Sequence, residues 1–227
     1  MIRKRFIKTT DSEDENVFWV TMTDLLLGLA IIFMTLFILA MTGFTQTKLN
    51  QQAAQGEVAK ELVKNFKKEQ LDVQVDKLTG QVKISDLELF DLNSYTLSDK
   101  GKKYLDKFIP IYVDTIFSDP KLNSRISNIV IQGHTDSQTF ANVNTKEEQF
   151  TRNMNLSLQR ANAVEEYIFR TNYNKKFTDK LIQTLLVEGK SYTEPILVDG
   201  KEDYAKSLRV ELELIVKDSN IQDFLFK

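Results

Sequence analysis

The longest apolar stretch of the chain runs from Leu25 to Phe44, and no charged residue interrupts it. Its length matches the roughly 20 residues that a helix needs to cross the hydrocarbon core of a membrane. A helix of a soluble core is seldom apolar on every face over such a length. A cleaved signal peptide has a shorter apolar part, about 7–15 residues, and ends in small residues, which do not follow here. The pattern predicts a transmembrane helix, placed at residues 17–44 because Val17 to Thr23 are also mostly apolar or small.

Beyond residue 80, apolar positions recur with the periods of strands and helices. Strands are predicted at Gln81–Leu87, Ile129–Gln132, Gln183–Val187 and Val210–Val216, and helices at Leu105–Ile116 and Ser157–Arg170. Pro110 lies inside the first helical pattern and is expected to kink or split that helix. Strands separated by helices of this length predict a compact α+β layer.

Residues 45–79 are predicted to link the membrane helix to this layer. Within them Val58, Leu62 and Phe66 recur every four residues among lysines and glutamates, which indicates a weakly amphipathic helix. Such a helix could pack on its own domain, or it could act as a plug or a dimer contact. The spacing does not decide between these alternatives.

Charge and composition exclude several classes of function. The net charge is −2 and no basic stripe stands out, so a nucleic-acid partner is not expected. Cysteine is absent, which excludes disulfides, cysteine metal sites and a lipoprotein anchor. His134 is the single histidine and is expected to be structural, because zinc needs several ligands. No nucleophile–base set and no phosphate-binding glycine loop occur, so we expect no enzyme activity and no bound cofactor.

The distribution of basic residues predicts the orientation in the membrane. Four basic residues precede the span, namely Arg3, Lys4, Arg5 and Lys8. After the span the next basic residue is a lone Lys48. Because loops rich in Lys and Arg stay in the cytoplasm, residues 1–16 are predicted to form a cytoplasmic tail of an inner-membrane protein, with the C-terminal bulk in the periplasm.

Asp24 is the one carboxylate of the predicted span. If the helix begins near Val17, Asp24 lies about 10 Å inside it. An ionisable group at that depth is costly and usually faces a partner or a water path. Asp24 could instead cap a helix that begins at Leu25, but the apolar residues before it argue against that start. We therefore predict that Asp24 carries a transported cation, H⁺ or Na⁺.

The stretch FWVTMTDLLLGLAIIFMTLF, residues 18–37, resembles the membrane helix of MotB-type stator subunits. In that family a tryptophan shortly precedes one essential aspartate, and a phenylalanine-rich helix follows. Trp19, Asp24, Phe33 and Phe37 take these places here. The W-x-x-M-x-D-L form is more similar to the ZorB-type stator-like subunits of Zorya anti-phage defence systems than to flagellar MotB.

A second resemblance covers residues 80–217, with residues 218–227 left as a C-terminal tail. Its motifs are IQGHTDS (131–137), NMNLSLQRANAV (153–164), LVEGKSYTEPI (186–196) and SLRVELE (207–213). In this order they resemble the OmpA-like peptidoglycan-binding domain. The resemblance implies a βαβαββ-type layer of helices on a mixed sheet.

The OmpA-like motifs also imply a site for the zwitterionic end of diaminopimelate in peptidoglycan. By the resemblance, Asp136 takes the ammonium, Arg160 the carboxylate, Asn153 a hydrogen bond, and Leu156 walls the pocket. Thr135 and Arg209 are supporting residues. Without the resemblance, Asp136 could cap a turn and Arg160 could be a solvated helix residue.

The chain departs from the OmpA-like pattern in two places. Ser207 and Leu208 replace the first two members of an N-R-R triplet, so that Arg209 alone remains. The loop Ser137–Arg152, which carries Glu147 and Glu148, looks longer than the usual loop. Either change could weaken the site or alter its preference.

Together the two resemblances imply a stator subunit of an ion-driven rotary motor. Two copies would sit as a homodimer inside a pentameric ring of a multi-span A-type partner similar to MotA or ZorA, with the periplasmic domains held by peptidoglycan. Zorya-type phage defence is the preferred setting and flagellar rotation the second. A passive membrane-tethered anchor without ion flow is the structural alternative. An energy transducer like ExbD or TolR is disfavoured because it lacks the G-H-T-D domain.

Overall fold

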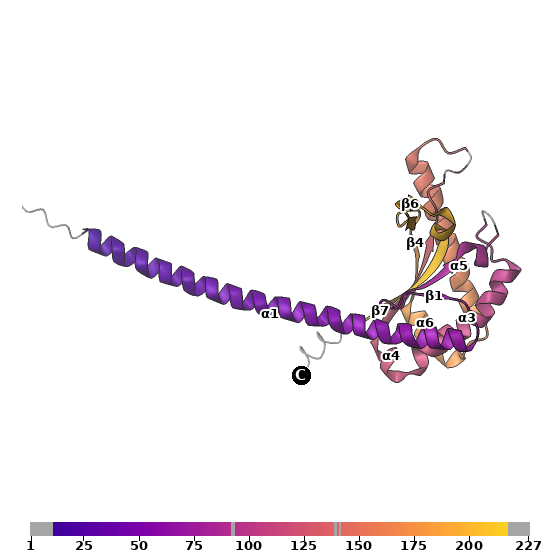
Figure 1. Ribbon diagram of the computed structural model, residues 1–227, viewed down its shortest axis with the longest axis horizontal. Coiled ribbons are helices and arrows are strands. Elements are labelled where there is room, and N and C mark those ends of the chain that lie inside the picture. Colours follow the sequence, from indigo (N-terminus) through magenta and orange to yellow (C-terminus); the bar gives the residue numbers. More distant parts are fainter. Residues whose placement is uncertain (1–10, 92–93, 139, 141, 218–227) are drawn as a thin grey trace, which may run out of the picture. The chain divides into compact units, whose positions relative to one another are not determined.

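The computed structural model of the chain describes residues 11–91, 94–138, 140 and 142–217. The predicted C-terminal tail, 218–227, lies outside the described residues, and so do residues 1–10 of the predicted cytoplasmic tail. The chain forms two compact units, residues 1–48 and residues 49–227. Figure 1 labels the elements in chain order.

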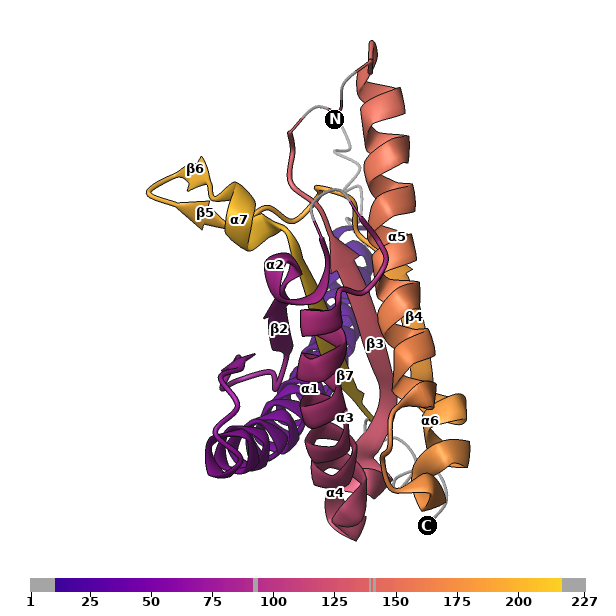
Figure 2. The same cartoon turned by 90° about the vertical axis from the view of Figure 1, so that its right-hand side faces the viewer.

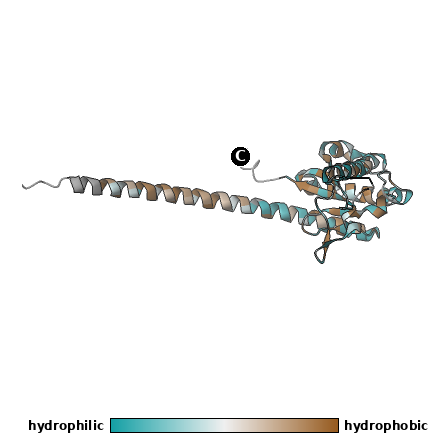
Figure 3. Ribbon diagram, turned by 90° about the horizontal axis from the view of Figure 1, so that it is seen from above, coloured by the Kyte–Doolittle hydropathy of each residue, from teal (hydrophilic) through white to brown (hydrophobic). Residues whose placement is uncertain are grey.

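Helix α1, Asp11–Lys68, contains the predicted membrane span. Among the described residues it is the one helix long and apolar enough to cross a membrane. The side chains of residues 17–44 are exposed, and Figure 3 shows the apolar colouring of this part giving way to a hydrophilic one further along the helix. Since α1 runs through Asp24 without a break, Asp24 does not cap a helix that begins at Leu25.

The last part of α1 belongs to the second unit, which begins at Leu49. Val58, Leu62 and Phe66 are buried in the core of that unit. The ring of Phe66 stacks on Phe108 with centroids 5.2 Å apart. The amphipathic helix of the predicted linker therefore packs on its own domain in this structure, because its apolar stripe completes the domain core.

A five-stranded mixed sheet forms the centre of the second unit, in the order β1-β2-β7-β3-β4. Its strands are β1 Gln74–Val75, β2 Val82–Ser85, β7 Arg209–Val216, β3 Ile126–His134 and β4 Leu185–Gly189. β4 pairs parallel with β3, and the other pairs are antiparallel. A separate hairpin joins β5 (Leu197–Val198) to β6 (Lys201–Glu202) through Asp199 and Gly200, both with positive φ, as a two-residue hairpin turn requires.

Two long helices, α3 (Asp99–Ser118) and α5 (Lys146–Arg170), lie side by side (Figure 2), and α5 contacts β3 and β4 of the sheet. The shorter helices are α2 (Asp86–Leu89), α4 (Pro120–Arg125), η1 (Lys175–Phe177), α6 (Thr178–Thr184) and α7 (Tyr204–Ser207). The alternating residues of β7, Val210, Leu212 and Leu214, face the same core as α3 and α5. This arrangement confirms the predicted α+β layer of helices on a mixed sheet.

Three details differ from the sequence-based predictions. α3 is continuous through Pro110 and is not split. α5 begins at Lys146, where the Thr145 hydroxyl accepts a hydrogen bond from the Glu148 N–H, so the loop after β3 is shorter than expected. Gln183 and Thr184 end α6 instead of beginning a strand, because a helical turn carries Leu181 into the core.

The close approach of α5 to the sheet depends on glycine. A Cβ atom on Gly133 would overlap the carbonyl oxygen of Ser157, and one on Gly189 would lie 2.9 Å from the Ser157 hydroxyl. That hydroxyl also accepts a hydrogen bond from the Ser191 N–H at 3.1 Å. The glycine of the G-H-T-D motif therefore lets α5 touch β3, which sets the position of Arg160, one turn beyond Ser157.

Gly133→Ala is expected to lower the free energy of unfolding by about 3 kcal/mol, because backbone must move to make room for the methyl group. Gly56→Ala is the matched control, since its Cβ would meet its nearest neighbour at an ordinary 3.8 Å. Chemical denaturation of the two variants checks this. Equal stabilities would show that α5 does not depend on the glycine contact.

Candidate functional site

The predicted peptidoglycan residues come from two elements that meet at one end of the sheet. Thr135 and Asp136 directly follow β3, while Asn153, Leu156 and Arg160 lie along α5. The Thr135 N–H donates to the Ser191 carbonyl oxygen at 2.9 Å, which fixes the start of the loop after β3. The structure thus brings Asp136 and Arg160 into one electrostatic group, although they are far apart in sequence.

Arg160 is deeply buried, with only 3% of its side chain exposed. Its Nη2 lies 3.0 Å from Oδ2 of Asp86, and its Nε donates to the Ser94 carbonyl oxygen at 3.0 Å. The guanidinium carbon lies 5.4 Å from the centre of the Phe90 ring. Nη1 is buried and has no hydrogen-bond partner among the residues that the structure describes. Arg160 is therefore not the solvated helix residue of the alternative reading.

Asp86 is the site residue that the sequence did not reveal. It is the first residue of α2, directly after β2, and 5% of its side chain is exposed. Burial raises the pKa of Asp86 to about 6, the charge of Arg160 opposes the rise, and the charge of Asp136 adds to it. The one available signal was an acidic residue in the first turn after a strand, which is too common to single it out.

Asp136 is 9% exposed, and its Oδ1 accepts a hydrogen bond from the Gln138 N–H at 3.2 Å. Burial raises the pKa of Asp136, and the neighbouring Glu202 adds to the rise, while the Gln138 N–H and Arg160 oppose it. Asp136 does form part of a local turn, as the alternative interpretation held, but the charge of Arg160 also acts on it. Asp86 pairs directly with Arg160, and the charge of Asp136 acts on both, so that these three residues, all ionised, carry a net charge of −1.

The remaining predicted residues lie around this group with different environments. Asn153 is buried, and its Nδ2 donates to the Gln149 carbonyl oxygen at 3.1 Å. Leu156 is half-buried on α5. The Thr135 hydroxyl is buried without a hydrogen-bond partner. Their contacts to a ligand remain predictions.

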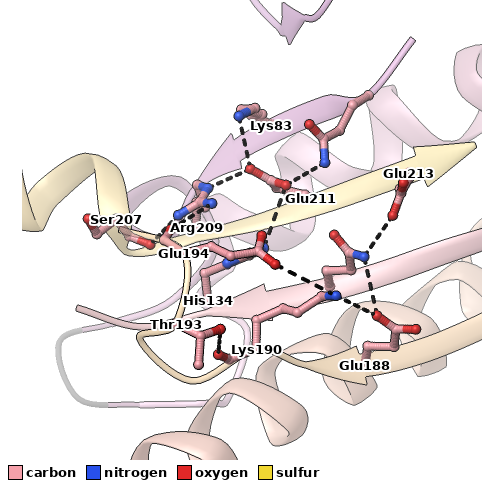
Figure 4. A network of polar contacts seen from close by, with 12 residues as sticks. Lys83, His134, Glu188, Lys190, Thr193, Glu194, Ser207, Arg209, Glu211 and Glu213 are labelled. Atoms are coloured by element: carbon pink, nitrogen blue, oxygen red, sulfur yellow. Dashed lines mark hydrogen bonds and ion pairs between the residues drawn. The ribbon is translucent and has the colours of Figure 1, made fainter. Parts of the chain in front are cut away.

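Arg209 belongs to a separate polar network over the sheet (Figure 4). Its Nε lies 2.5 Å from Glu211, and its Nη2 donates to the Glu194 carbonyl oxygen at 3.2 Å. Glu211 also pairs with Lys83 at 3.1 Å and lies 3.6 Å from the ring of His134. Burial alone would raise the pKa of Glu211, but its contacts with His134 and Arg209 lower it to about 2. Arg209 therefore ties a loop to β7, in keeping with a supporting position.

His134 is 1% exposed beside Glu211, as expected for a structural histidine. Within the described ranges, no three histidine or carboxylate side chains gather in a way that could hold a metal ion.

Asp24 lies in the other unit and is exposed on α1. One turn before it, the Thr21 hydroxyl donates to the main-chain carbonyls of Val17 and Phe18 at 3.0 and 2.9 Å. Hydroxyl hydrogens bound in this way leave the Thr21 oxygen as an acceptor on the same side of the helix as Asp24. The role of Asp24 in carrying a cation remains a prediction.

The raised pKa of Asp86 predicts an unusual dependence of stability on pH. Between the ordinary value of 3.8 and about 6, the folded chain binds a proton that the unfolded chain does not. The contribution of this group to the free energy of unfolding is therefore expected to rise by about 2–3 kcal/mol as the pH falls from about 7.5 to about 4. Denaturation of wild type and Asp86→Asn across this range measures it as the difference between the two curves. Glu88→Gln, a variant at an exposed carboxylate on the same helix, should track wild type, and parallel curves for all three would contradict the prediction.

The sequence of this chain is similar to a known protein family and to two known proteins. The OmpA family matches residues 89–209. A protein named Zorya protein ZorB from Escherichia coli strain Crooks is 29% identical over 214 residues, which cover 89% of this chain and 89% of that protein. A second protein of that name, from another Escherichia coli strain, is 23% identical and covers 91% of this chain and 83% of its own length.

The fold also has a counterpart among solved structures. The crystal structure of a MotB-like protein from Desulfovibrio vulgaris is 19% identical, covers 76% of this chain and 97% of its own, and superimposes with a TM-score of 0.51. This likeness concerns the fold alone. Together these matches confirm the resemblance that the motifs indicated, to OmpA-like domains and to ZorB-type proteins.

Proposed function

The chain belongs to the OmpA family, and from this premise we propose that it is the wall-anchored B-type stator subunit of an ion-driven rotary membrane motor. The main support for this proposal is one observation. A single polypeptide combines an apolar helix that holds one carboxylate, Asp24, with an OmpA-family domain whose Arg160 and Asp136 meet at one site.

The chemistry of the site supports peptidoglycan as its ligand. Arginine pairs with carboxylates through two parallel hydrogen bonds, and a carboxylate accepts hydrogen bonds from an ammonium. The side-chain end of diaminopimelate offers both groups on one carbon. We propose that Asp136 takes the ammonium, Arg160 the carboxylate and Asn153 a further hydrogen bond, with Leu156 along the wall of the pocket and Thr135 and Arg209 in support.

The membrane part of the proposal follows from the span. Residues 17–44 cross the inner membrane once, with the N-terminus in the cytoplasm and the wall-binding domain in the periplasm. Protons or sodium ions pass by way of Asp24 at the boundary with a multi-span A-type subunit. Two copies of the chain stand within a pentameric ring of that subunit, and the wall holds the pair against the torque.

Zorya-type phage defence is the setting we favour, because two proteins named Zorya protein ZorB align with this chain over nearly their whole length. Flagellar rotation is the second candidate, and it rests on the likeness of the membrane helix to MotB-type subunits. A passive tether without ion flow is the third.

Two assays on the full chain separate these candidates. Sedimentation with purified peptidoglycan sacculi tests the anchor, and the full chain is expected to co-sediment. Phage plating on cells that express the chain with its multi-span partner tests defence, while swimming of a stator-deficient strain tests the flagellar setting. If the chain did not bind sacculi, the proposal that it is anchored to the wall would be wrong. If it bound sacculi but supported neither phage defence nor swimming, the passive tether would be the remaining candidate.

A further inference from the structure

The guanidinium of Arg160 is buried and already engaged by two groups of its own chain, the Ser94 carbonyl oxygen and the Asp86 carboxylate. Bidentate recognition of a carboxylate needs two N–H groups that point the same way. On one edge, Nε is engaged by the Ser94 carbonyl oxygen and Nη2 by Asp86. Asp86 Oδ2 can occupy only one of the two N–H groups of Nη2, and on the edge shared with Nη1, Nη1 is buried and has no hydrogen-bond partner among the described residues. A ligand carboxylate that approaches through the place of Asp86 would meet Nη2 directly, whereas an approach through Nη1 would have to reach a buried atom.

The main chain of Asp86 is fixed by two hydrogen bonds, whereas its side chain is held by one ion pair, which a ligand could replace. Its N–H donates to the Leu208 carbonyl oxygen at 3.0 Å, and its own carbonyl oxygen accepts from the Phe90 N–H at 2.8 Å. The side chain makes one ion pair through Oδ2, while Oδ1 is buried without a partner. These main-chain hydrogen bonds hold α2 without the Asp86 carboxylate, so breaking the ion pair does not by itself undo the helix.

We propose that Asp86 is an internal stand-in for the peptidoglycan carboxylate, which closes the site on Arg160 until a wall ligand displaces it. The inference rests on the proposed function and adds a regulatory residue to that same site. The Asp86–Arg160 ion pair and the ligand–Arg160 ion pair exclude each other. A ligand can bind only those molecules in which Asp86 has left Arg160. The apparent affinity is therefore the intrinsic affinity multiplied by the fraction of such molecules.

The charges of Asp86, Asp136 and Arg160 determine which ligands can displace Asp86. A carboxylate alone would add to the charges of Asp86 and Asp136, whereas a zwitterion brings an ammonium for Asp136 together with the carboxylate for Arg160. A ligand with an ammonium but no carboxylate satisfies Asp136 and leaves Asp86 in place. The site is therefore opened by the diaminopimelate side-chain end and not by a lysine side chain in the same stem peptide.

Titration calorimetry on the full chain in detergent tests this with two muropeptides, a disaccharide tripeptide that ends in diaminopimelate and its lysine counterpart. Asp86→Asn keeps the shape of the residue and removes its charge, and it is expected to bind the diaminopimelate muropeptide about tenfold more tightly than wild type. Glu88→Gln removes an exposed carboxylate two residues away and should bind like wild type. Binding of the lysine muropeptide should not change in either variant.

The outcomes separate this inference from the proposed function. If folded Asp86→Asn binds the diaminopimelate muropeptide no more tightly than wild type does, Asp86 is not a stand-in for the ligand carboxylate. The proposal that the chain is anchored to the wall is unaffected by that result. If neither protein binds that muropeptide, the proposed wall anchor fails and the inference fails with it.

A structure of the unmodified chain with the diaminopimelate muropeptide provides a test that does not depend on the folding of a variant. The expected result is a ligand carboxylate on Arg160 and an Asp86–Arg160 separation beyond the limit of about 4 Å for an ion pair, in place of 3.0 Å. A ligand seated on Arg160 with the Asp86 pair intact would overturn the proposal.

Discussion

Asp24→Asn is expected to abolish phage protection, so that cells carrying this variant with the multi-span partner are infected as readily as cells without the system. Asparagine has nearly the same shape as aspartate but cannot hold a negative charge, so it cannot load and release a cation within the apolar helix. Plating efficiency measures the loss. Asp24→Glu, which keeps the carboxylate, is expected to retain part of the activity.

The controls for this variant address assembly. Because Asp24 is exposed on α1 and its side chain has no part in the core of the second unit, Asp24→Asn should insert in the membrane, pair with a second copy and bind sacculi like wild type. If cells with Asp24→Asn were fully protected, Asp24 would not carry a cation and the chain would be a passive tether.

Arg160→Lys is expected to weaken binding to sacculi by about a hundredfold, which corresponds to roughly 3 kcal/mol. Lysine retains the charge beside Asp86 and Asp136, so the buried carboxylates keep a counter-ion, but it lacks the planar fork that grips a carboxylate through two hydrogen bonds. Co-sedimentation with sacculi over a range of concentrations gives the change in affinity.

Arg152→Lys is the matched control for this experiment. Arg152 lies on the same helix, is about half exposed, and pairs with Glu148 one turn earlier at 2.7 Å. Its replacement should leave binding unchanged, because surface ion pairs contribute little. Equal binding by wild type, Arg160→Lys and Arg152→Lys would show that the wall is gripped elsewhere.

The sequence was informative about the site where the motifs were contiguous. Thr135 and Asp136 follow the predicted strand and Arg160 lies on the predicted helix Ser157–Arg170, so periodicity placed these three. Asn153 and Leu156 precede that predicted helix and were assigned to the site by the OmpA-like motif alone, whereas in the structure they lie on α5. Asp86 could not be found in this way. It lies in a four-residue helix with no periodic pattern, and its partner Arg160 is distant in sequence. Only the packing of α5 against the sheet brings the two charges together.

The fold was predicted best where one side of an element is apolar. β7, with Val210, Leu212 and Leu214 on its core face, matched the alternating pattern almost to the residue. The boundary of the second unit was harder to predict, because α1 passes from the predicted membrane span to the domain core without a break in the helix. A weak stripe such as Val58, Leu62 and Phe66 indicates that a face is buried but not what buries it.

Cation flux into vesicles that contain the chain and its multi-span partner tests the central claim most directly. With an imposed proton or sodium gradient, the wild-type complex is predicted to carry a flux of one of these ions, and the Asp24→Asn complex, purified in the same amount, is predicted to carry none. Equal flux through both complexes would contradict a motor driven by way of Asp24.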